Sequence, residues 1–446
     1  MLSTGIVGRL VVVPVVACVA LVSTTGATAS TVTPCPQQFG SLAAGSWPSA
    51  CWRPYGPDSP FNKLLPADPK ISPESGAIVA DMMRLKYHFE GGGSRFDFTS
   101  WGRGAVYYAQ PSDPMVKVNC TALWGANTCQ GDNGVVVDGM SIHVPGGAQP
   151  APGSDHHLTV VDQANDVEYD FELASFSADR QTLTVAAASQ IPIGPDQGAG
   201  LGAQSTAAHF STIAGLIREP ELAAGAINHA LVVSIPCTEG SVSPAQGPWG
   251  YACSQMGQSR QGGEIAPHLG TLFQLKMTDA QIAASGAPAW EQAIMTAMAH
   301  YGMYANDTNG PGDPDSFELE KEADVSYTSL GAQPPMADLL KSLPGSTYWA
   351  PSDIWIASGP TIDFSRLRVI DPCVAQGTCP PSGQRPAHAA LHHSPKAAPS
   401  CRRARPSNEP GRHRGQHHIR RAASCVRSAH HYHRGRRKQG CVRARC

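Results

Sequence analysis

Histidine and carboxylate side chains gather on a predicted β-hairpin, residues 155–173. Two segments with alternating apolar and polar residues flank the turn-forming residues 163–166. If those four residues form the turn, His157 lies opposite Glu172, and Asp170 lies two residues before Glu172 on the same face. The hairpin therefore predicts one polar face that holds an imidazole and two carboxylates.

This arrangement suits acid–base chemistry on a polysaccharide. A carboxylate can orient an imidazole, and paired carboxylates are the usual machinery of glycoside hydrolysis. In a hydrolase, Glu172 would be the general acid and Asp170 the base or nucleophile. In a lyase, His157 or His229 would remove the proton. The simpler interpretation is that these side chains form an ordinary solvent-facing side of an antiparallel sheet.

A second group of candidates follows a predicted amphipathic helix over residues 207–217. Arg218 comes directly after it, and His229 lies on a predicted strand over residues 228–235. In a lyase, Arg218 would neutralise an acidic sugar before the proton is removed. The simpler interpretations are a local ion pair between Arg218 and Glu221 and a hydrogen-bonded core position for His229.

A third segment, residues 307–318, has acidic residues spaced as in an EF-hand loop. Pro311 stands where a ligand is expected, which favours an acidic surface loop. Calcium is the only cofactor that the sequence suggests. Its candidate ligands are Asp307, Asn309, Asp313, Asp315 and Glu318.

The rival to an enzyme is a non-catalytic protein that binds carbohydrate or cell wall. Trp101, Tyr107 and Tyr108 would then be the stacking platforms for sugar rings. A cleft with buried carboxylates would favour the enzyme, and a flat aromatic strip the binding protein. The sequence contains no G-x-S-x-G elbow, no phosphate-binding G-x-x-x-x-G-K-[ST] loop and no uninterrupted dinucleotide fingerprint, so lipase, nucleotide and nicotinamide chemistry lack support.

The net charge of −2 is an average over two unlike parts of the 446-residue chain. Residues 30–384 hold 16 Lys and Arg against 34 Asp and Glu, a net charge of −18. Residues 385–446 hold 16 Lys and Arg against one acid, Glu409, with nine His and four Cys. The acidic part argues against nucleic acid as a partner. We expect the tail, residues 381–446, to be disordered, either as a basic or metal-binding arm or, as we favour, as a non-native extension.

The first 29 residues read as a secretion signal. A short positive region, an apolar run and the small-residue site Ala27-Thr28-Ala29 follow one another in the expected order. A lipid-anchored Cys18 is the less favoured alternative, because the apolar run continues beyond it. No later window is apolar enough for a membrane span, so we expect an exported protein.

Eight cysteines remain after Cys18 and the tail are set aside, which in an exported protein indicates disulfides. Near neighbours are the preferred partners, although eight cysteines allow 105 pairings. The pairs are Cys35–Cys51, Cys120–Cys129, Cys237–Cys253 and Cys373–Cys379.

Seven short β-branched or aromatic runs, spaced about ten residues apart, follow residue 105. They are residues 105–108, 115–118, 134–137, 141–144, 157–162, 167–173 and 182–187, with later strands at 228–235, 272–276 and 353–357. The expected fold is a mainly β single domain, an antiparallel β-sandwich or jelly roll, over residues 61–380. A Pro- and Ser-rich lead-in, residues 30–60, precedes it. Peripheral helices are expected at 219–224, 288–304 and 336–343.

Three motifs resemble a recurring pattern in secreted bacterial proteins of unassigned activity. They are AAHFSTIAGLIR followed by INHAL, HHLTVVD followed by YDFE, and HYGMY followed by Asp307. Those proteins often carry Asp or Glu at the position of Asp170. The resemblance covers roughly residues 57–372 and implies export and a shared fold, but no activity.

Overall fold

The computed structural model describes much of the acidic part of the chain. The described residues are 42, 45–84, 96–99, 104–125, 127–194, 196–247, 250, 252–253, 266–308, 317–338, 347–349, 354–356 and 362–379. The chain divides into two units, residues 1–384 and 385–446, and all described residues belong to the first. The predicted signal, Cys18 and the basic tail lie outside the described residues, as do Cys35 and Trp101.

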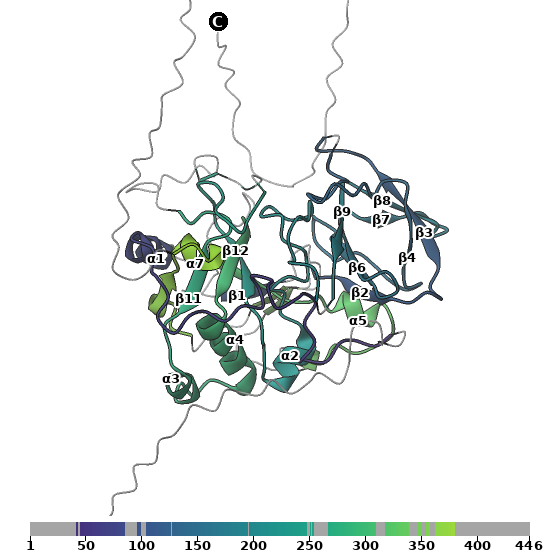
Figure 1. The fold of residues 1–446 in the computed structure, drawn as a ribbon. Helices are drawn as coiled ribbons and strands as arrows, with labels where there is room; N and C mark the ends of the chain where they lie inside the picture. Colours follow the sequence, from purple (N-terminus) through teal and green to yellow (C-terminus); the bar gives the residue numbers. More distant parts are fainter. Residues whose placement is uncertain are drawn as a thin grey trace, which may run out of the picture. The chain divides into compact units, whose positions relative to one another are not determined.

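Strands account for more of the described residues than helices do (Figure 1). The strands are β1 (Phe96–Thr99), β2 (Val106–Ala109), β3 (Met115–Cys120), β4 (Ser141–His143), β5 (Leu158–Asp162), β6 (Val167–Glu172), β7 (Ser175–Phe176), β8 (Thr182–Val185), β9 (Ala187–Pro192), β10 (Leu231–Ile235), β11 (Leu272–Leu275), β12 (Met303–Thr308), β13 (Phe317–Glu320), β14 (Thr347–Trp349), β15 (Ile354–Ile356) and β16 (Leu367–Val369). The helices are α1 (Ser75–Arg84), α2 (Glu219–Ala224), α3 (Asp279–Ala283), α4 (Ala289–His300), α5 (Val325–Thr328) and α7 (Pro372–Gln376), with a 3₁₀ turn at Phe364–Arg366.

The strands form three sheets, each with parallel as well as antiparallel neighbours. An eight-stranded sheet has the order β14-β15-β1-β13-β10-β12-β11-β16, and two four-stranded sheets have the orders β2-β5-β6-β9 and β4-β3-β8-β7. The pairs β1–β13, β10–β12, β2–β5 and β3–β8 are parallel. The expectation of a purely antiparallel fold is therefore wrong. Parallel neighbours need long crossovers, which a list of short strands does not reveal.

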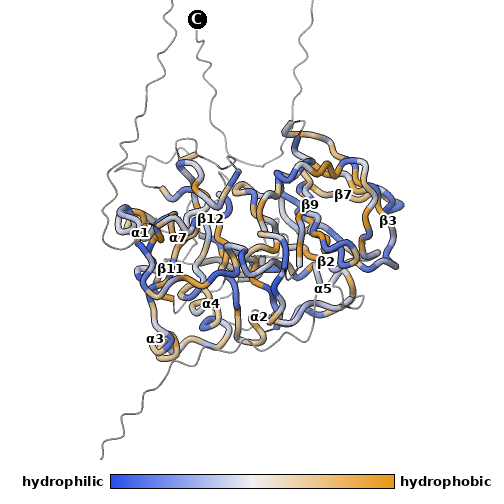
Figure 2. Tube along the Cα trace, viewed as in Figure 1, coloured by the Kyte–Doolittle hydropathy of each residue, from blue (hydrophilic) through white to orange (hydrophobic). Residues whose placement is uncertain are grey.

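The two four-stranded sheets share one apolar core. Tyr107, Val160 and Phe171 come from one sheet, and Val118 and Leu183 from the other. Hydrophobic residues line this region (orange near β7 and β9 in Figure 2). A mainly β fold is confirmed, whereas the sandwich or jelly-roll arrangement stays a prediction.

The eight-stranded sheet buries a separate core on each face. On one face, Ile294 and Met298 of α4 pack with Leu231 of β10. The other face carries Val232 and Tyr304, which pack in a second core with the segments described next.

Two irregular segments fill the space between the eight-stranded sheet and the sheet that contains β5. One is residues 52–61, which contributes Trp52, Tyr55 and Phe61 to the core. The other is residues 207–216, which contributes Phe210. The predicted lead-in, residues 30–60, thus includes part of the packed core.

Residues 207–217 do not form the predicted helix but a series of turns. His209 and Gly215 adopt left-handed φ values of 58° and 78°, which interrupt any helix. The main-chain N–H groups of Thr212 and Ile213 donate instead to carboxylates of β6. Tertiary hydrogen bonds thus replace the helical ones that the apolar periodicity suggested.

Other boundaries differ as well. The predicted strand at 134–137 is reduced to an isolated bridge between Gln130 and Val136. The predicted helix at 288–304 ends at His300, because Gly302 turns left-handed and β12 begins at Met303. Only residues 336–338 of the last predicted helix are described.

Three of the predicted disulfides are confirmed: Cys120–Cys129, Cys237–Cys253 and Cys373–Cys379. Cys51 is also disulfide-bonded, while its predicted partner lies outside the described residues. Each confirmed pair closes a short loop, as proximity in the sequence suggested. Within the described ranges, no helix is long and apolar enough to cross a membrane.

Candidate functional site

The predicted hairpin exists, with the predicted register. In the β5–β6 pair, Thr159 lies opposite Asp170 and Leu158 lies opposite Phe171. The polar face does not meet solvent, however, because Thr159 and Asp170 are both 0% exposed. Residues 207–216 cover it, so the solvent-facing interpretation is wrong.

Asp170 shares this buried face with Glu168, a residue that the sequence analysis did not single out. The two side chains hydrogen-bond to each other, and both are fully buried. Tyr55 donates to Glu168 at 2.6 Å, and Thr159 donates to Asp170 at 2.8 Å. The strand alternation that selected Asp170 and Glu172 places Glu168 on the same face, so the signal was present.

Burial and the proximity of the two groups shift the pKa values of this carboxyl pair upward. Burial raises the pKa of Glu168 well above its ordinary value, and the charge of Asp170 raises it further, against the lowering effect of the Tyr55 hydrogen bond. Burial also raises the pKa of Asp170, but hydrogen bonds from Thr159, Glu168 and Thr212 oppose that rise. Both pKa values are raised, that of Glu168 more strongly, so Glu168 is the member of the pair that holds a proton more readily.

His157 and Glu172, the other predicted catalytic pair, lie at the end of this hairpin. The β5–β6 ladder stops at Leu158 and Phe171, so their predicted opposition is not part of it. His157 is buried, whereas Glu172 is partly exposed and pairs in the ladder with Ala187. The carboxylate that hydrogen-bonds to Asp170 is thus Glu168.

Arg218 and His229 do meet, through Glu221. Arg218 donates to Glu221 at 2.5 Å, and Nε2 of His229 lies 3.1 Å from the same oxygen. Nδ1 of His229 lies 2.8 Å from the carbonyl oxygen of Ala230. Both ring nitrogens thus face hydrogen-bond acceptors. His229 has no ring nitrogen free to take a proton from a substrate.

This ion cluster is closed to solvent. Arg218 also donates to the carbonyl oxygens of Ser49 and Trp52, and it lies 5.1 Å from the Trp52 ring. Burial alone would raise the pKa of Glu221, but the charges of Arg218 and His229 bring it below its ordinary value. Through its hydrogen bonds to the carbonyl oxygens of Ser49 and Trp52, Arg218 therefore ties residues 49–52 to this cluster, in which Glu221 pairs its charge.

Tyr107 and Tyr108 are not exposed platforms, since they are 0% and 5% exposed. Successive residues of β2 point to opposite faces, so Tyr107 enters the core between the four-stranded sheets and Tyr108 the core beside Trp52. Burial, followed by the nearby charge of Glu322, raises the pKa of Tyr108 well above its ordinary value.

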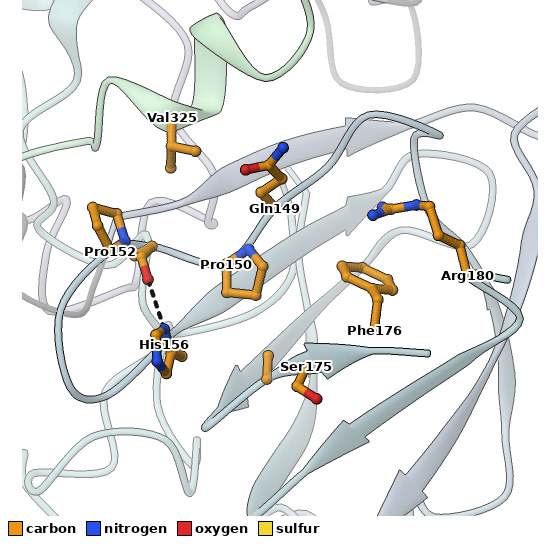
Figure 3. Close-up of a pocket in the computed structure, with 10 residues that line it drawn as sticks. Gln149, Pro150, Pro152, His156, Ser175, Phe176, Arg180 and Val325 are labelled. Atoms are coloured by element: carbon orange, nitrogen blue, oxygen red, sulfur yellow. Dashed lines mark hydrogen bonds between the residues drawn. The ribbon is translucent and has the colours of Figure 1, made fainter. Parts of the chain in front are cut away.

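An open pocket of about 520 Å³ lies just beyond the end of the hairpin at which His157 and Glu172 lie (Figure 3). Its polar side chains are His156, Gln149 and Arg180, together with Ser175, and the rest of its lining is apolar. The apolar lining consists of Pro150, Ala151, Pro152, Ala174, Phe176 and Val325. His156 is the neighbour of the predicted His157, but Arg180 follows β7 in a separate turn, and nothing in the sequence links it to the hairpin.

Tyr107 forms hydrogen bonds with two segments that line this pocket. Its hydroxyl oxygen lies 2.8 Å from the carbonyl oxygen of Gln149 and 3.1 Å from that of Val325, and it accepts from the N–H of Gln149 at 3.0 Å. Tyr107 therefore positions the loop at Gln149 relative to α5, although its ring cannot touch a ligand.

The backbone around the pocket is held in uncommon conformations. Among the described residues, six non-glycine residues have a left-handed φ, and three lie at the pocket or beside it: His156 (46°), Leu173 (51°) and Arg180 (58°). Such conformations cost about 1–3 kcal/mol each and persist where the surrounding structure enforces them, often at binding sites.

The predicted calcium loop is only partly described. The structure does not describe Asn309, Asp313 and Asp315. Asp307 lies near the end of β12, and Glu318 lies in β13. An EF-hand loop connects two helices, so strands on both sides do not match it. In the described part of the chain, no group of three or more His, Cys, Asp or Glu side chains is arranged to hold a metal ion.

Comparison with protein-family models, with curated proteins and with solved structures finds no match to this chain. The resemblance to secreted bacterial proteins therefore stays a prediction.

Proposed function

We propose that this protein is exported and that it binds a saccharide of a polysaccharide or cell wall in the pocket beside His156. The observation that carries the proposal is an open pocket whose wall is mostly apolar and whose few polar groups converge on it. Ligand sites have this character. A sugar ring offers both apolar C–H faces, which match the prolines and Phe176, and hydroxyl groups, which match the side chains of Gln149 and His156.

Phe176 has a central role in this proposal. It forms part of the wall, and the guanidinium carbon of Arg180 lies 4.0 Å from the centre of its ring. Phe176→Ala should therefore remove wall area and release Arg180 together. We expect the Kd for a bound oligosaccharide to rise about tenfold or more, which corresponds to about 1.4 kcal/mol.

The measurement is calorimetry on the full chain, after a screen of oligosaccharides from plant, fungal and bacterial walls. Trp124→Ala is the matched control, because Trp124 is an exposed aromatic residue, 49% accessible, outside the pocket lining. Equal weakening in both variants, or no binding of any saccharide by the unmodified protein, would refute the proposal.

Cleavage of the polysaccharide is a second candidate function, suggested by the buried carboxyl groups of Glu168 and Asp170. In a hydrolysis the two carboxyl groups would first have to separate, because glycosidases hold them about 5 Å or more apart; Glu168 would then give its proton to the glycosidic oxygen while Asp170 takes a proton from the attacking water. The sum is the addition of one water across the bond, with release of a hydroxyl end and a reducing end. Because Tyr55 donates to Glu168 and residues 207–216 cover the pair, both Tyr55 and this segment have to move before a substrate can reach it.

The predicted lyase with Arg218 and His229 has less support, because their hydrogen-bonding groups already serve Glu221, Trp52 and Ala230. Reducing ends and unsaturated uronates, measured on the same polysaccharides, separate hydrolysis, elimination and binding alone.

A further inference from the structure

We propose that the ligand of the pocket is an acidic saccharide and that its carboxylate pairs with Arg180. This inference rests on the proposed function and specifies its ligand. The argument comes from the charge, the position and the incomplete pairing of Arg180.

Arg180 has few partners of its own. One guanidinium nitrogen donates to the carbonyl oxygen of Ala148 at 2.6 Å, and Phe176 lies against the guanidinium. Within the described ranges no carboxylate forms an ion pair with it, although its sequence neighbour is Asp179. A guanidinium has five N–H donors, so most of them stay available.

Asp179, the residue before Arg180, forms its hydrogen bonds within its own turn. Asp179 accepts from the hydroxyl of Ser177 and from the main-chain N–H of Gln181, inside its own turn. These hydrogen bonds lower the pKa of Asp179, so it stays ionised and is held away from Arg180. The turn thus separates the cation from the carboxylate that would otherwise neutralise it.

The position of Arg180 is fixed toward the pocket. Figure 3 shows its guanidinium extended above Phe176, on the side of Gln149 and Pro150. A cation–π contact orients the planar group without using its in-plane N–H donors, which then meet a carboxylate two at a time. The left-handed φ of Arg180 adds a backbone conformation that an Arg adopts only when its surroundings enforce it.

The opposite side of the pocket can bind a neutral hydroxyl. Nδ1 of His156 lies 3.3 Å from the carbonyl oxygen of Ala151, which favours the proton on Nδ1 and leaves Nε2 as an acceptor. The pocket therefore offers one cationic donor, one neutral acceptor and an apolar wall. These match the carboxylate, the hydroxyl groups and the C–H face of a uronic acid.

The charge of the whole body favours a carboxylate over more highly charged groups. Residues 30–384 carry a net charge of −18, which repels all anionic chains and repels densely sulfated or phosphorylated chains most strongly. A single Arg is enough to pair with one carboxylate. The ligand is therefore expected to be a short or sparsely charged uronate segment.

Matched ligands test this inference without any change to the protein. Oligosaccharides of galacturonate, of alginate and of hyaluronan are each compared with their carboxyl-reduced forms, by calorimetry on the full chain. At least one uronate oligosaccharide should bind about 10- to 100-fold more tightly than its reduced form, the usual effect of a hydrogen bond to a charged group.

Substitutions of Arg180 test whether its side chain causes the preference for acidic saccharides. Arg180→Gln should abolish the preference for the acidic form and leave the reduced form bound as before, while Arg180→Lys should retain part of it. Arg366→Gln is the control, because Arg366 is exposed and pairs with Asp363 outside the pocket. Melting temperatures show whether each variant is folded.

The outcomes separate the two proposals. If neutral and acidic saccharides bind equally, or only sulfated or peptide ligands bind, the acidic-saccharide inference is overturned. If no saccharide of any kind binds, the proposed function fails as well. A preference for uronates that survives in a folded Arg180→Gln variant would place the carboxylate elsewhere and also contradict the inference.

Discussion

At the scale of single residues, the interior holds many charged groups, and they are arranged in small self-contained sets. Arg218, Glu221 and His229 form one set, and Glu168 with Asp170 forms another. A third set joins Lys321 to Glu219 and Asp324. Buried charges persist only when they are paired or hydrogen-bonded, and each set meets that condition.

Glu168→Gln tests whether the carboxyl pair does chemistry. A glutamine amide can donate to Asp170, and its oxygen can still accept from Tyr55, but its NH2 group cannot accept from the main-chain N–H of Ile213, so the melting temperature should fall moderately. It has no acidic proton to give. If the pair catalyses hydrolysis, release of reducing ends should fall by about 100-fold or more.

The control is Glu239→Gln, since Glu239 is exposed. Unchanged turnover in a folded Glu168→Gln variant would show that the carboxyl pair takes no part in catalysis and has only a structural role. The melting temperature of the variant shows how much the lost hydrogen bond from Ile213 destabilises the fold.

Part of this residue-level organisation could be predicted from the sequence. Alternation along β6 places Asp170 opposite Thr159, and the spacing of Arg218 and Glu221 indicates their ion pair. The contact between His229 and Glu221 is different, because it depends on how the loop between α2 and β10 folds back against α2. Local spacing does not describe such packing.

At the scale of elements, the segment over residues 207–217 departs most from prediction. Its apolar residues recur with helical spacing, yet it folds as turns between two sheets. Gly215 marks the reason: with φ at 78°, a Cβ there would come within 2.7 Å of the Val232 side chain and 3.0 Å of the Ala230 carbonyl oxygen. Only glycine fits so close to β10.

Gly215→Ala should therefore be strongly destabilising. The left-handed φ alone costs about 1 kcal/mol, and the overlap with β10 adds about 1–3 kcal/mol. Gly286→Ala is the matched control, because Gly286 has φ at 79° and no atom within 4 Å of its added Cβ. Denaturant unfolding should show a larger loss for Gly215→Ala by at least about 1 kcal/mol; equal losses would contradict the close approach to β10.

Hairpin elements were predictable, and distant pairings were not. The β5–β6 hairpin follows from a turn between two alternating runs, and its register follows from the length of that turn. The parallel pairs β2–β5 and β3–β8 join residues about 50 or more apart in the sequence. Nothing in the local pattern of either strand selects its partner, so the three-sheet topology had no sequence signal.

At the scale of the whole molecule, buried carboxyl groups make stability depend on pH. Burial raises the pKa of Glu322 from 4.5 to about 7, even though Tyr327 donates to it and Arg218 is near. The folded state therefore binds a proton that the unfolded state has lost in this range. The stabilisation from Glu322 is complete below about pH 4.5 and disappears as pH rises through about 7.

Glu322→Gln should flatten this dependence. A glutamine keeps the hydrogen bond from Tyr327 but does not titrate, so the fall in unfolding free energy between pH 5 and pH 8 should shrink by up to about 3 kcal/mol. Burial likewise raises the pKa of Glu219 to about 8, so some dependence should remain. Denaturant unfolding at several pH values measures the slope. Glu74→Gln, at an exposed residue, should leave the slope unchanged, and an unaltered slope in Glu322→Gln would contradict the assignment.

The strand order of the large sheet also determines when the molecule can fold. β1, near residue 97, pairs with β13 near residue 318, and Ser75 at the start of α1 accepts from the main-chain N–H of Val369. During synthesis, β1 and α1 thus cannot form these contacts until some 220 to 290 further residues of the chain have been made. Because chains with such distant contacts fold slowly, this one should assemble as a single unit after nearly all of the body has been synthesised, rather than progressively from its N-terminus.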